Sequence, residues 1–211
     1  MDSRLYVLTG HAYYKGRQLK DVIAAALRGG ADCIQLREKD YSGRELLEAG
    51  HLLRRLTREA GVKLIINDRI DVARAVDADG VHLGQGDLPI QVAREILGAG
   101  KIVGLSTHNV EEAVAAERAG ADYIGLGPMK PTQTKLDTEP VVGPAGVLEV
   151  RRHVRLPIVA IGGITAADTA EIIRCGANSV AVVSAVVGAD DVEAAARELR
   201  EIVDRERGSR V

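Results

Sequence analysis

Eight short apolar runs, rich in β-branched residues, recur along the chain, and each is followed by a longer amphipathic segment. This alternation is typical of repeated strand–helix units. The apolar runs are Leu5–Leu8, Cys33–Leu36, Val62–Ile66, Gly80–Leu83, Ile102–Leu105, Tyr123–Leu126, Pro157–Ile161 and Ser179–Val183. The segments predicted to be helical are Leu19–Arg28, Gly43–Ala60, Val72–Val76, Ile90–Leu97, Val110–Ala119, Ala145–Val154, Ala166–Cys175 and Val192–Asp204. Because the runs are apolar on both faces, they predict parallel strands covered by helices.

Eight such units within 211 residues predict a single-domain α/β protein, a (β/α)8 TIM barrel that spans residues 1–211. A doubly wound open sheet is the alternative with the same order of elements. A Gly-Ala pair precedes several runs and is interpreted as the end of the preceding helix. Such pairs occur at Gly30-Ala31-Asp32, Gly120-Ala121-Asp122 and Gly176-Ala177-Asn178. The polar tail, residues 205–211, is expected to be frayed.

The composition argues against several classes of partner. With 28 Lys+Arg against 30 Asp+Glu, the net charge of -2 provides no global basic field for nucleic acid or anionic lipid. Five Tyr, no Phe and no Trp leave few surfaces on which single-stranded bases stack. Cys33 and Cys175 lie far apart, without a CxxC motif, so both are expected to be buried small apolar residues in a reducing compartment. No signal peptide or membrane-length apolar stretch is visible. We therefore expect a cytoplasmic protein that binds small molecules, and neither nucleic acid nor a membrane.

Polar residues follow the predicted strands. In a TIM barrel the loops after the strands form the working face. The second run continues into Gln35-Leu36-Arg37-Glu38-Lys39, the third into Asn67-Asp68-Arg69, and the fourth is followed by Asp87. Ser106-Thr107-His108 follows the fifth run, and Thr132-Gln133-Thr134-Lys135 lies after the sixth. The sequence therefore predicts an active site at the carboxyl ends of the strands.

The seventh and eighth runs lead to Gly162-Gly163 and to Ser184. Barrels often bind phosphate in these two loops, through free backbone N–H groups and a helix N-terminus. The alternative is a tight turn that requires glycine for its conformation alone. With both loops suited to an anion, we expect a phosphorylated ligand.

Asp68 and Asp87 follow neighbouring strands, so their carboxylates are expected to converge. Magnesium is commonly held by one or two carboxylates together with substrate phosphate oxygens and water. The alternative is that Asp68 or Asn67 caps the next helix and that Asp87 begins the turn before Pro89. Three cations on the same predicted rim, Arg37, Lys39 and Lys135, favour the metal interpretation. A metal ion and three cations together indicate a multiply charged anion such as a diphosphate.

The two histidines near these residues are weaker candidates. His82 lies within a strand pattern and is expected to be packed and hydrogen-bonded. His108 precedes a helix that Asn109 is better suited to cap. The chain has no nucleophile elbow and no HExxH motif, so the sequence gives no support for hydrolase chemistry.

In their order and spacing these motifs resemble the thiamine phosphate synthase family, and the resemblance covers nearly the whole chain. The stretches that carry it are Tyr6-Val7-Leu8-Thr9, Gln35 to Lys39, Asn67-Asp68-Arg69, Gly80 to Gln85 with Asp87, Ser106-Thr107-His108, Thr132 to Lys135 and Ala160 to Ile164. The resemblance implies a TIM barrel that joins hydroxymethylpyrimidine diphosphate to thiazole phosphate. The implied products are thiamine phosphate and pyrophosphate. The implied mechanism is dissociative, with pyrophosphate leaving before the thiazole nitrogen attacks.

Matched motif by motif, the resemblance assigns roles to residues of this chain. Arg37, Lys39, Ser106 and Lys135 would be catalytic. The pyrimidine diphosphate would be held by Gln35, Leu36, Arg37, Glu38, Lys39, Asn67, Ser106 and Lys135. The thiazole phosphate would be held by Thr132, Gln133, Thr134, Gly163, Val183 and Ser184. Asp68 and Asp87 would bind Mg²⁺.

One residue departs from the family pattern, and other functions remain open. The family usually has Phe before the Pro-Thr segment, whereas this chain has Lys130, which would alter the packing of that loop or add a cation to the site. A thiazole tautomerase-like paralogue and a non-enzymatic sensor of phosphorylated ligands are the alternatives to the synthase. A barrel lyase that binds phosphate is a further one, and it would ordinarily require a reactive lysine or an acid/base pair.

Overall fold

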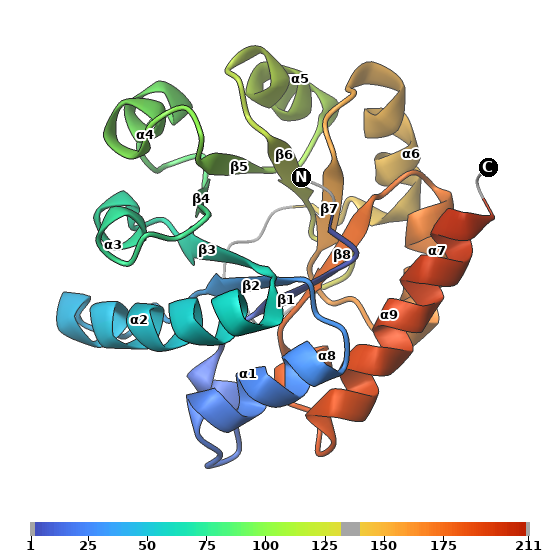
Figure 1. The fold of residues 1–211 in the computed structure, drawn as a ribbon. Coiled ribbons are helices and arrows are strands. Elements are labelled where there is room, and N and C mark those ends of the chain that lie inside the picture. Colours follow the sequence, from blue (N-terminus) through green and yellow to red (C-terminus); the bar gives the residue numbers. More distant parts are fainter. Residues whose placement is uncertain (1–2, 132–139, 210–211) are drawn as a thin grey trace.

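The computed structural model describes residues 3–131 and 140–209, and its centre is a closed barrel of eight parallel strands. The strands pair in sequence order and β8 closes onto β1 (Figure 1). Their bounds are β1 Leu5–Leu8, β2 Cys33–Leu36, β3 Lys63–Asn67, β4 Gly80–Leu83, β5 Ile102–Thr107, β6 Tyr123–Leu126, β7 Ile158–Ile161 and β8 Ser179–Val182. The barrel prediction is therefore confirmed, and the open sheet is excluded.

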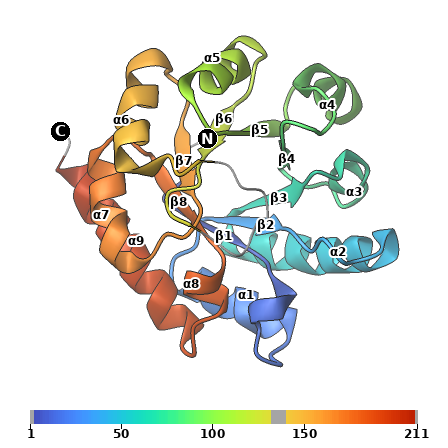
Figure 2. The same ribbon diagram turned by 180° about the vertical axis from the view of Figure 1, so that it is seen from behind.

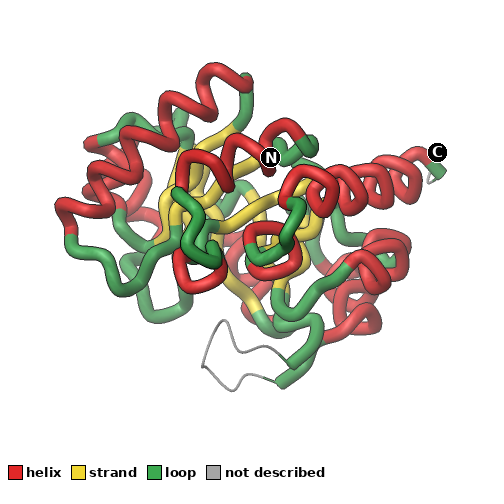
Figure 3. Tube along the Cα trace, turned by 90° about the horizontal axis from the view of Figure 1, so that it is seen from below, coloured by secondary structure: helices red, strands yellow, loops and turns green. Residues whose placement is uncertain are grey.

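Helices surround the barrel on all sides (Figures 2 and 3). Their bounds are α1 Leu19–Arg28, α2 Gly43–Ala60, α3 Ile70–Ala75, α4 Ile90–Leu97, α5 Val110–Arg118, α6 Gly143–His153, α7 Ala166–Arg174, α8 Ser184–Val187 and α9 Val192–Gly208. A short 3-10 helix, η1, spans His11–Tyr13. The sequence pattern did not predict η1 or α8, because neither is long enough to show a helical period.

Two apolar layers hold the barrel. Side chains alternate along each strand, so Leu5 and Val7 of β1 pack outward against the helices, whereas Tyr6 points into the barrel. The inner layer comprises Tyr6, Leu8, Cys33, Ile65, Tyr123, Val159 and Ala181. It contains two phenols and a thiol, so the barrel floor is partly polar.

The amino ends of the strands are joined by a contact that occurs four times around the barrel. In each case the acceptor is the side chain of the residue directly before β2, β4, β6 or β8. The donor is a backbone N–H in the first two residues of the strand before it, which is β1, β3, β5 or β7. Asp32 accepts from Leu5 (3.2 Å), Asp79 from Leu64 (2.7 Å), Asp122 from Val103 (2.7 Å) and Asn178 from Ile158 (2.9 Å). These four contacts satisfy strand N–H groups that a barrel end would otherwise leave unpaired.

An arginine from a surrounding helix completes each of the four contacts. The pairs are Arg200 with Asp32 (3.4 Å), Arg54 with Asp79 (2.7 Å), Arg94 with Asp122 (2.6 Å) and Arg151 with Asn178 (3.4 Å). The Gly-Ala pairs noted in the sequence, each followed by Asp or Asn, mark three of these positions. The fourth position, Asp79, does not follow a Gly-Ala pair. There Asp77, at φ +53°, adopts the left-handed conformation that glycine adopts at the other three positions.

Two sequence expectations are corrected by the fold. The tail expected to be frayed from residue 205 is helical through Gly208, and Arg207 donates to the carbonyls of Ser3 and Asn178. Cys33 is buried as expected, but Cys175 is only partly buried. Among the described residues, none of the helices has the length and apolar character needed to span a bilayer.

Candidate active site

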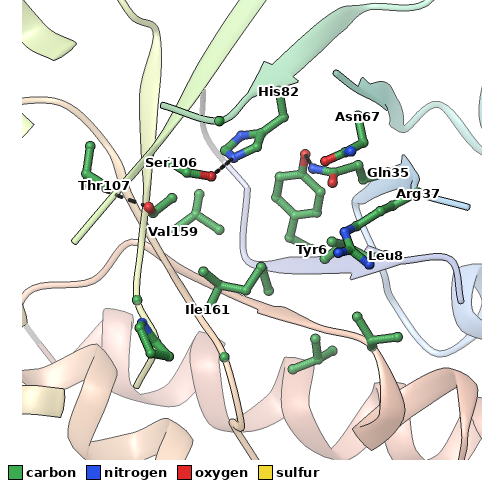
Figure 4. Close-up of a pocket in the computed structure, with 18 of the residues that line it drawn as sticks. Tyr6, Leu8, Gln35, Arg37, Asn67, His82, Ser106, Thr107, Val159 and Ile161 are labelled. Atoms are coloured by element: carbon green, nitrogen blue, oxygen red, sulfur yellow. Dashed lines mark hydrogen bonds between the residues drawn. The ribbon is translucent and has the colours of Figure 1, made fainter. Parts of the chain in front are cut away.

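A cavity of about 550 Å³ opens at the carboxyl ends of the strands. Every strand of the barrel contributes to its lining, and Figure 4 shows part of it. The lining includes ten residues predicted from the sequence, namely Gln35, Arg37, Lys39, Asn67, Asp68, Asp87, Ser106, Gly163, Val183 and Ser184. Residues from six different strand ends are thus brought together, as the barrel prediction required.

The segment that follows β2 divides its side chains between two environments. Gln35, Arg37 and Lys39 line the cavity. Leu36, by alternation, packs in the outer apolar layer with 1% of its surface exposed. Glu38 is buried and accepts hydrogen bonds from the His11 backbone N–H (2.9 Å) and the Tyr14 hydroxyl (2.9 Å). The side chains of Leu36 and Glu38 thus lie outside the cavity lining, and Glu38 holds the loop after β1. Their part in ligand binding stays a prediction.

Asp68 and Asp87 meet at the rim of the cavity. Burial and its hydrogen-bonding contact with Asp87 raise the pKa of Asp68 to about 6, against the opposing effect of Lys39 and Arg37. Asp68 adopts φ +58°, a left-handed conformation that Asp and Asn tolerate better than most residues. Asp87 also accepts from the Gly84 backbone N–H (2.6 Å), which fixes the position of one carboxylate oxygen.

This pair of carboxylates suits a divalent cation that also binds a substrate. Two acidic groups held together in a partly buried site repel each other, and a cation between them would remove that repulsion. Within residues 3–131 and 140–209, no cluster of three or more His, Cys, Asp or Glu side chains is arranged to hold a metal. The remaining ligands would therefore come from water and from substrate oxygens, which is the usual way in which proteins bind Mg²⁺.

The raised pKa of Asp68 predicts the pH dependence of stability. The folded protein binds this proton more tightly than the unfolded chain, whose ordinary pKa is 3.8. Stability is therefore lost as the pH rises from about 4 through about 6, and it stays lower above that range. Asp68→Asn should stabilise the metal-free protein by about 1 kcal/mol at pH 8, a value reduced from the full shift because the side chain is partly exposed.

Urea unfolding at pH 4 and pH 8 tests this expectation. At pH 4 the wild type and Asp68→Asn should have similar stability, because the carboxyl of Asp68 is then largely protonated. Added Mg²⁺ at pH 8 should stabilise the wild type but not the variant. A variant that is destabilised equally at both pH values would contradict the electrostatic origin of the effect.

The loops after β7 and β8 form the other side of the cavity. Gly162 and Gly163 have φ values of +99° and +69°. A Cβ at Gly163 would lie 2.8 Å from the Cβ of Lys130, so this turn requires glycine for both conformation and space. Ser184 begins the short helix α8, and both Ser184 and Val183 face the cavity. The predicted Thr132, Gln133, Thr134 and Lys135 lie outside the described residues.

The two histidines take the positions expected of them. The Nδ1 of His82 is 2.9 Å from the Tyr123 hydroxyl, and its Nε2 is 2.9 Å from the Ser106 hydroxyl (Figure 4). Asn109 caps α5 by accepting from the Glu112 N–H (2.8 Å), and His108 contacts the Glu112 carboxylate (3.0 Å). His82 is thus both packed and part of the cavity wall, a combination that the sequence did not predict.

Lys130 does not act as an additional cation in the cavity. Its ammonium forms an ion pair with Asp168 (2.5 Å), a residue in the first turn of α7. The backbone N–H of Lys130 donates to the Gly162 carbonyl (3.0 Å). This residue therefore ties the loop after β6 to the loop after β7, and the interpretation that it alters loop packing is favoured over the added cation.

Tyr6 and Tyr123 are cavity residues to which the sequence analysis gave no role. Both point into the barrel, both are almost fully buried, and their hydroxyls lie 2.9 Å apart. The signal was present in the alternation of β1 and β6, which places a phenol on the inner face of each strand. A polar tip on an inward-facing position of a barrel strand indicates a hydrogen-bonding floor.

Several known proteins are similar to this chain in sequence and in structure. The family model described as thiamine monophosphate synthase matches residues 5–186. A thiamine-phosphate synthase from Chloroflexus aurantiacus is 54% identical over 203 residues, which cover 96% of this chain and 94% of that protein. Another from Moorella thermoacetica is 50% identical over 204 residues, covering 97% of each. The solved structure of a thiamine phosphate pyrophosphorylase from Pyrococcus furiosus has a TM-score of 0.90 and 43% identity, with 97% of both chains covered. The chain therefore belongs to the thiamine monophosphate synthase family of transferases.

Proposed function

We propose that the chain joins the diphosphate of 4-amino-2-methyl-5-hydroxymethylpyrimidine to thiazole phosphate and releases pyrophosphate. The observation that carries this proposal is the meeting of two carboxylates, Asp68 and Asp87, with two cations, Arg37 and Lys39, on one rim of the cavity. A divalent cation and two basic groups match the charge of a diphosphate better than that of a single phosphate. The names of the relatives, thiamine-phosphate synthase and thiamine phosphate pyrophosphorylase, support thiamine phosphate as the product.

The diphosphate end of the substrate would lie against Arg37 and Lys39. Mg²⁺ bound by Asp68 and Asp87 would supply Lewis-acid stabilisation of the negative charge that grows on the leaving group. Ser106 would donate its hydroxyl to the same group, and Gln35 and Asn67 would hold the pyrimidine. Lys135, by its place in the family motif, is proposed to add a third cation. Positive groups placed where charge develops act in the transition state more than in the ground state.

The bond between the pyrimidine methylene carbon and the diphosphate oxygen would break first. Pyrophosphate leaves with the electron pair, and the pyrimidinylmethyl cation is then captured by the lone pair of the thiazole nitrogen. One C–O bond is thus exchanged for one C–N bond, and no protein nucleophile is needed. The cavity walls would hold the thiazole nitrogen in line with the cation.

The thiazole phosphate would lie on the opposite side of the cavity. Gly163, Val183 and Ser184 line that side, where free backbone N–H groups suit an anion. Thr132, Gln133 and Thr134 are proposed to complete the site by their match to the family motif. We also propose that the reaction takes place in the cytoplasm, with small molecules as the only substrates and no nucleic-acid or membrane partner.

Mass spectrometry of a reaction that contains both substrates and Mg²⁺ tests the proposed function. We expect thiamine phosphate and pyrophosphate in equal amounts, and no product when either substrate is left out. Isomerisation of the thiazole without coupling would favour the tautomerase. Tight binding without pyrophosphate release, even at high protein concentration, would favour the sensor.

A further inference from the structure

A chain of five hydrogen-bonded side chains crosses the floor of the cavity. Gln35 Nε2 donates to the Tyr6 hydroxyl (2.7 Å), and the Tyr6 hydroxyl lies 2.9 Å from that of Tyr123. Tyr123 contacts Nδ1 of His82 (2.9 Å), whose Nε2 contacts the Ser106 hydroxyl (2.9 Å). The chain, here called the floor network, runs through residues of β2, β1, β6, β4 and β5 in that order. Figure 4 shows both of its ends, with Gln35 beside Tyr6 and His82 bonded to Ser106.

Each member of the floor network has restricted donor capacity, so the network has two consistent directions. A phenol carries one proton, and a neutral imidazole donates from one nitrogen and accepts at the other. In the first direction, Gln35 donates to Tyr6 and the protons point toward Ser106. His82 then carries its proton on Nε2, and the Ser106 proton is free to point into the cavity. In the reverse direction, Tyr6 donates to the Gln35 carbonyl and Ser106 donates to His82.

The direction fixes what the cavity offers at two separate places. In the first direction Gln35 presents its carbonyl oxygen, an acceptor, and Ser106 presents a donor. In the reverse direction Gln35 presents an N–H donor and Ser106 an acceptor. In the structure Gln35 Nε2 donates to the Tyr6 hydroxyl, which is the bond that belongs to the first direction. We propose that the floor network couples the two ends of the cavity, so that a ligand that donates to Gln35 makes Ser106 a donor toward the leaving group.

Two glycines in the barrel wall make space for Tyr123 and His82, which are neighbours in the floor network. A Cβ at Gly104 would lie 2.2 Å from Cζ of Tyr123, and a Cβ at Gly125 would lie 2.9 Å from Cε1 of His82. Glycine within a strand weakens it, and it commonly marks a close approach by another group. Glycines at these two strand positions therefore let the rings of Tyr123 and His82 lie against the wall and reach each other.

Burial keeps the phenols protonated and the geometry fixed. Tyr6 and Tyr123 have relative exposures of 1% and 0%. Burial raises the pKa of both phenols well above the ordinary value, so each keeps its single proton at any physiological pH. Cys33 also lies beside Tyr6, and its thiol is a weak hydrogen-bonding partner that does not compete with a phenol.

The coupling explains how the cavity recognises both the amino group and the diphosphate of a single pyrimidine substrate. This inference rests on the proposed function. An exocyclic amino group on the pyrimidine would donate to Gln35 and favour the first direction. Ser106 would then donate to the diphosphate. An oxo group in place of the amino group would favour the reverse direction and would turn a lone pair of Ser106 toward an anion. Tyr6, Tyr123 and His82 are thus positioning residues, which act on the substrate through Gln35 and Ser106.

Nitrogen NMR of isotope-labelled histidine in the full chain reads the direction without any ligand. The resonances of His82 are identified by their loss in His82→Asn. We expect the wild type to carry the proton on Nε2. Gln35→Glu replaces the donor with a carboxylate, so Tyr6 must donate to it and the network reverses. A proton should therefore appear on Nδ1 of His82 in this variant.

Two further variants separate this transmission from a general effect of added charge. Asn67→Asp makes the same amide-to-carboxylate change on the cavity wall outside the network, and it should leave Nδ1 unprotonated. Gln35→Glu combined with Tyr6→Phe interrupts the network, and the proton should return to Nε2. Protonation of Nδ1 in Asn67→Asp, its persistence in the double variant, or its absence in Gln35→Glu would each overturn the proposal.

Calorimetry provides a second test that does not depend on Gln35→Glu folding. The probes are Mg²⁺ with inorganic pyrophosphate, titrated with and without saturating 4-amino-2-methyl-5-hydroxymethylpyrimidine. The aminopyrimidine should tighten pyrophosphate binding by about tenfold, the effect of one hydrogen bond to an anion, and Tyr6→Phe should abolish this gain. An equal gain in Tyr6→Phe would overturn the coupling. If neither probe binds the wild type, the proposed function fails, whereas the NMR result still decides on the network.

Discussion

Asp87→Asn is expected to lower kcat by on the order of 10³ while the protein stays folded. The variant removes one of the two charges that hold the cation but keeps an oxygen that accepts from the Gly84 N–H. Without the metal ion, the negative charge on the departing pyrophosphate is stabilised only by the basic side chains, namely Arg37, Lys39 and the proposed Lys135. Steady-state kinetics with saturating substrates, together with a thermal unfolding curve, checks both parts of the expectation.

Asp40→Asn is the matched control for Asp87→Asn. Asp40 is an exposed carboxylate directly after Lys39, and it is not among the residues that line the cavity. Its substitution should change kcat by less than about twofold, as for most surface positions. Near wild-type turnover of Asp87→Asn, or of the wild type in EDTA, would refute the metal role.

Asp79→Ala should cost about 3 kcal/mol of stability, the largest loss expected from a single change at the amino ends of the strands. Asp79 pairs with Arg54, a buried residue, and also accepts from the Leu64 N–H. Truncation leaves the guanidinium of Arg54 buried without its charge partner, which is the costly way to break an ion pair. Urea unfolding of both proteins measures the difference.

Activity and an exposed ion pair provide the comparisons for Asp79→Ala. Because Asp79 lies at the opposite end of the barrel from the cavity, kcat at 20 °C should be retained within about twofold. Asp190→Ala removes an exposed partner of Lys15 and should leave the unfolding midpoint nearly unchanged. A loss of kcat without a loss of stability in Asp79→Ala would show that the two ends of the barrel are not independent.

The sequence predicted the barrel because hydrophobic periodicity is a local property. Each strand can be recognised from the four to six residues that form it. Eight similar strand–helix units then leave few arrangements that bury both faces of every strand. The same local pattern predicted that Arg37, Lys39, Asp68 and Asp87 would meet, since the loops after parallel strands share one end of the barrel. These residues do line one cavity.

The features that the sequence did not predict are contacts between strands far apart in the chain and the directions in which single side chains point. The side chains of Leu36 and Glu38 point away from the cavity because side chains alternate along this segment. Glu38 instead accepts hydrogen bonds from His11 and Tyr14, which cannot be inferred from its being a carboxylate. The link between Tyr6 and Tyr123 joins residues that are 117 positions apart, and it exists only once the barrel closes. The alternation along β1 and β6 places both phenols inside the barrel, but it does not specify that their hydroxyls meet.

A crystal structure grown with Mn²⁺ and pyrophosphate tests the central claim directly, because the anomalous signal of the metal locates it without reference to protein chemistry. We predict one metal ion bound by the carboxylates of Asp68 and Asp87 and by pyrophosphate oxygens, with Arg37 and Lys39 on the same pyrophosphate. A metal ion bound away from both carboxylates, or pyrophosphate held outside the cavity at the carboxyl ends of the strands, would contradict it.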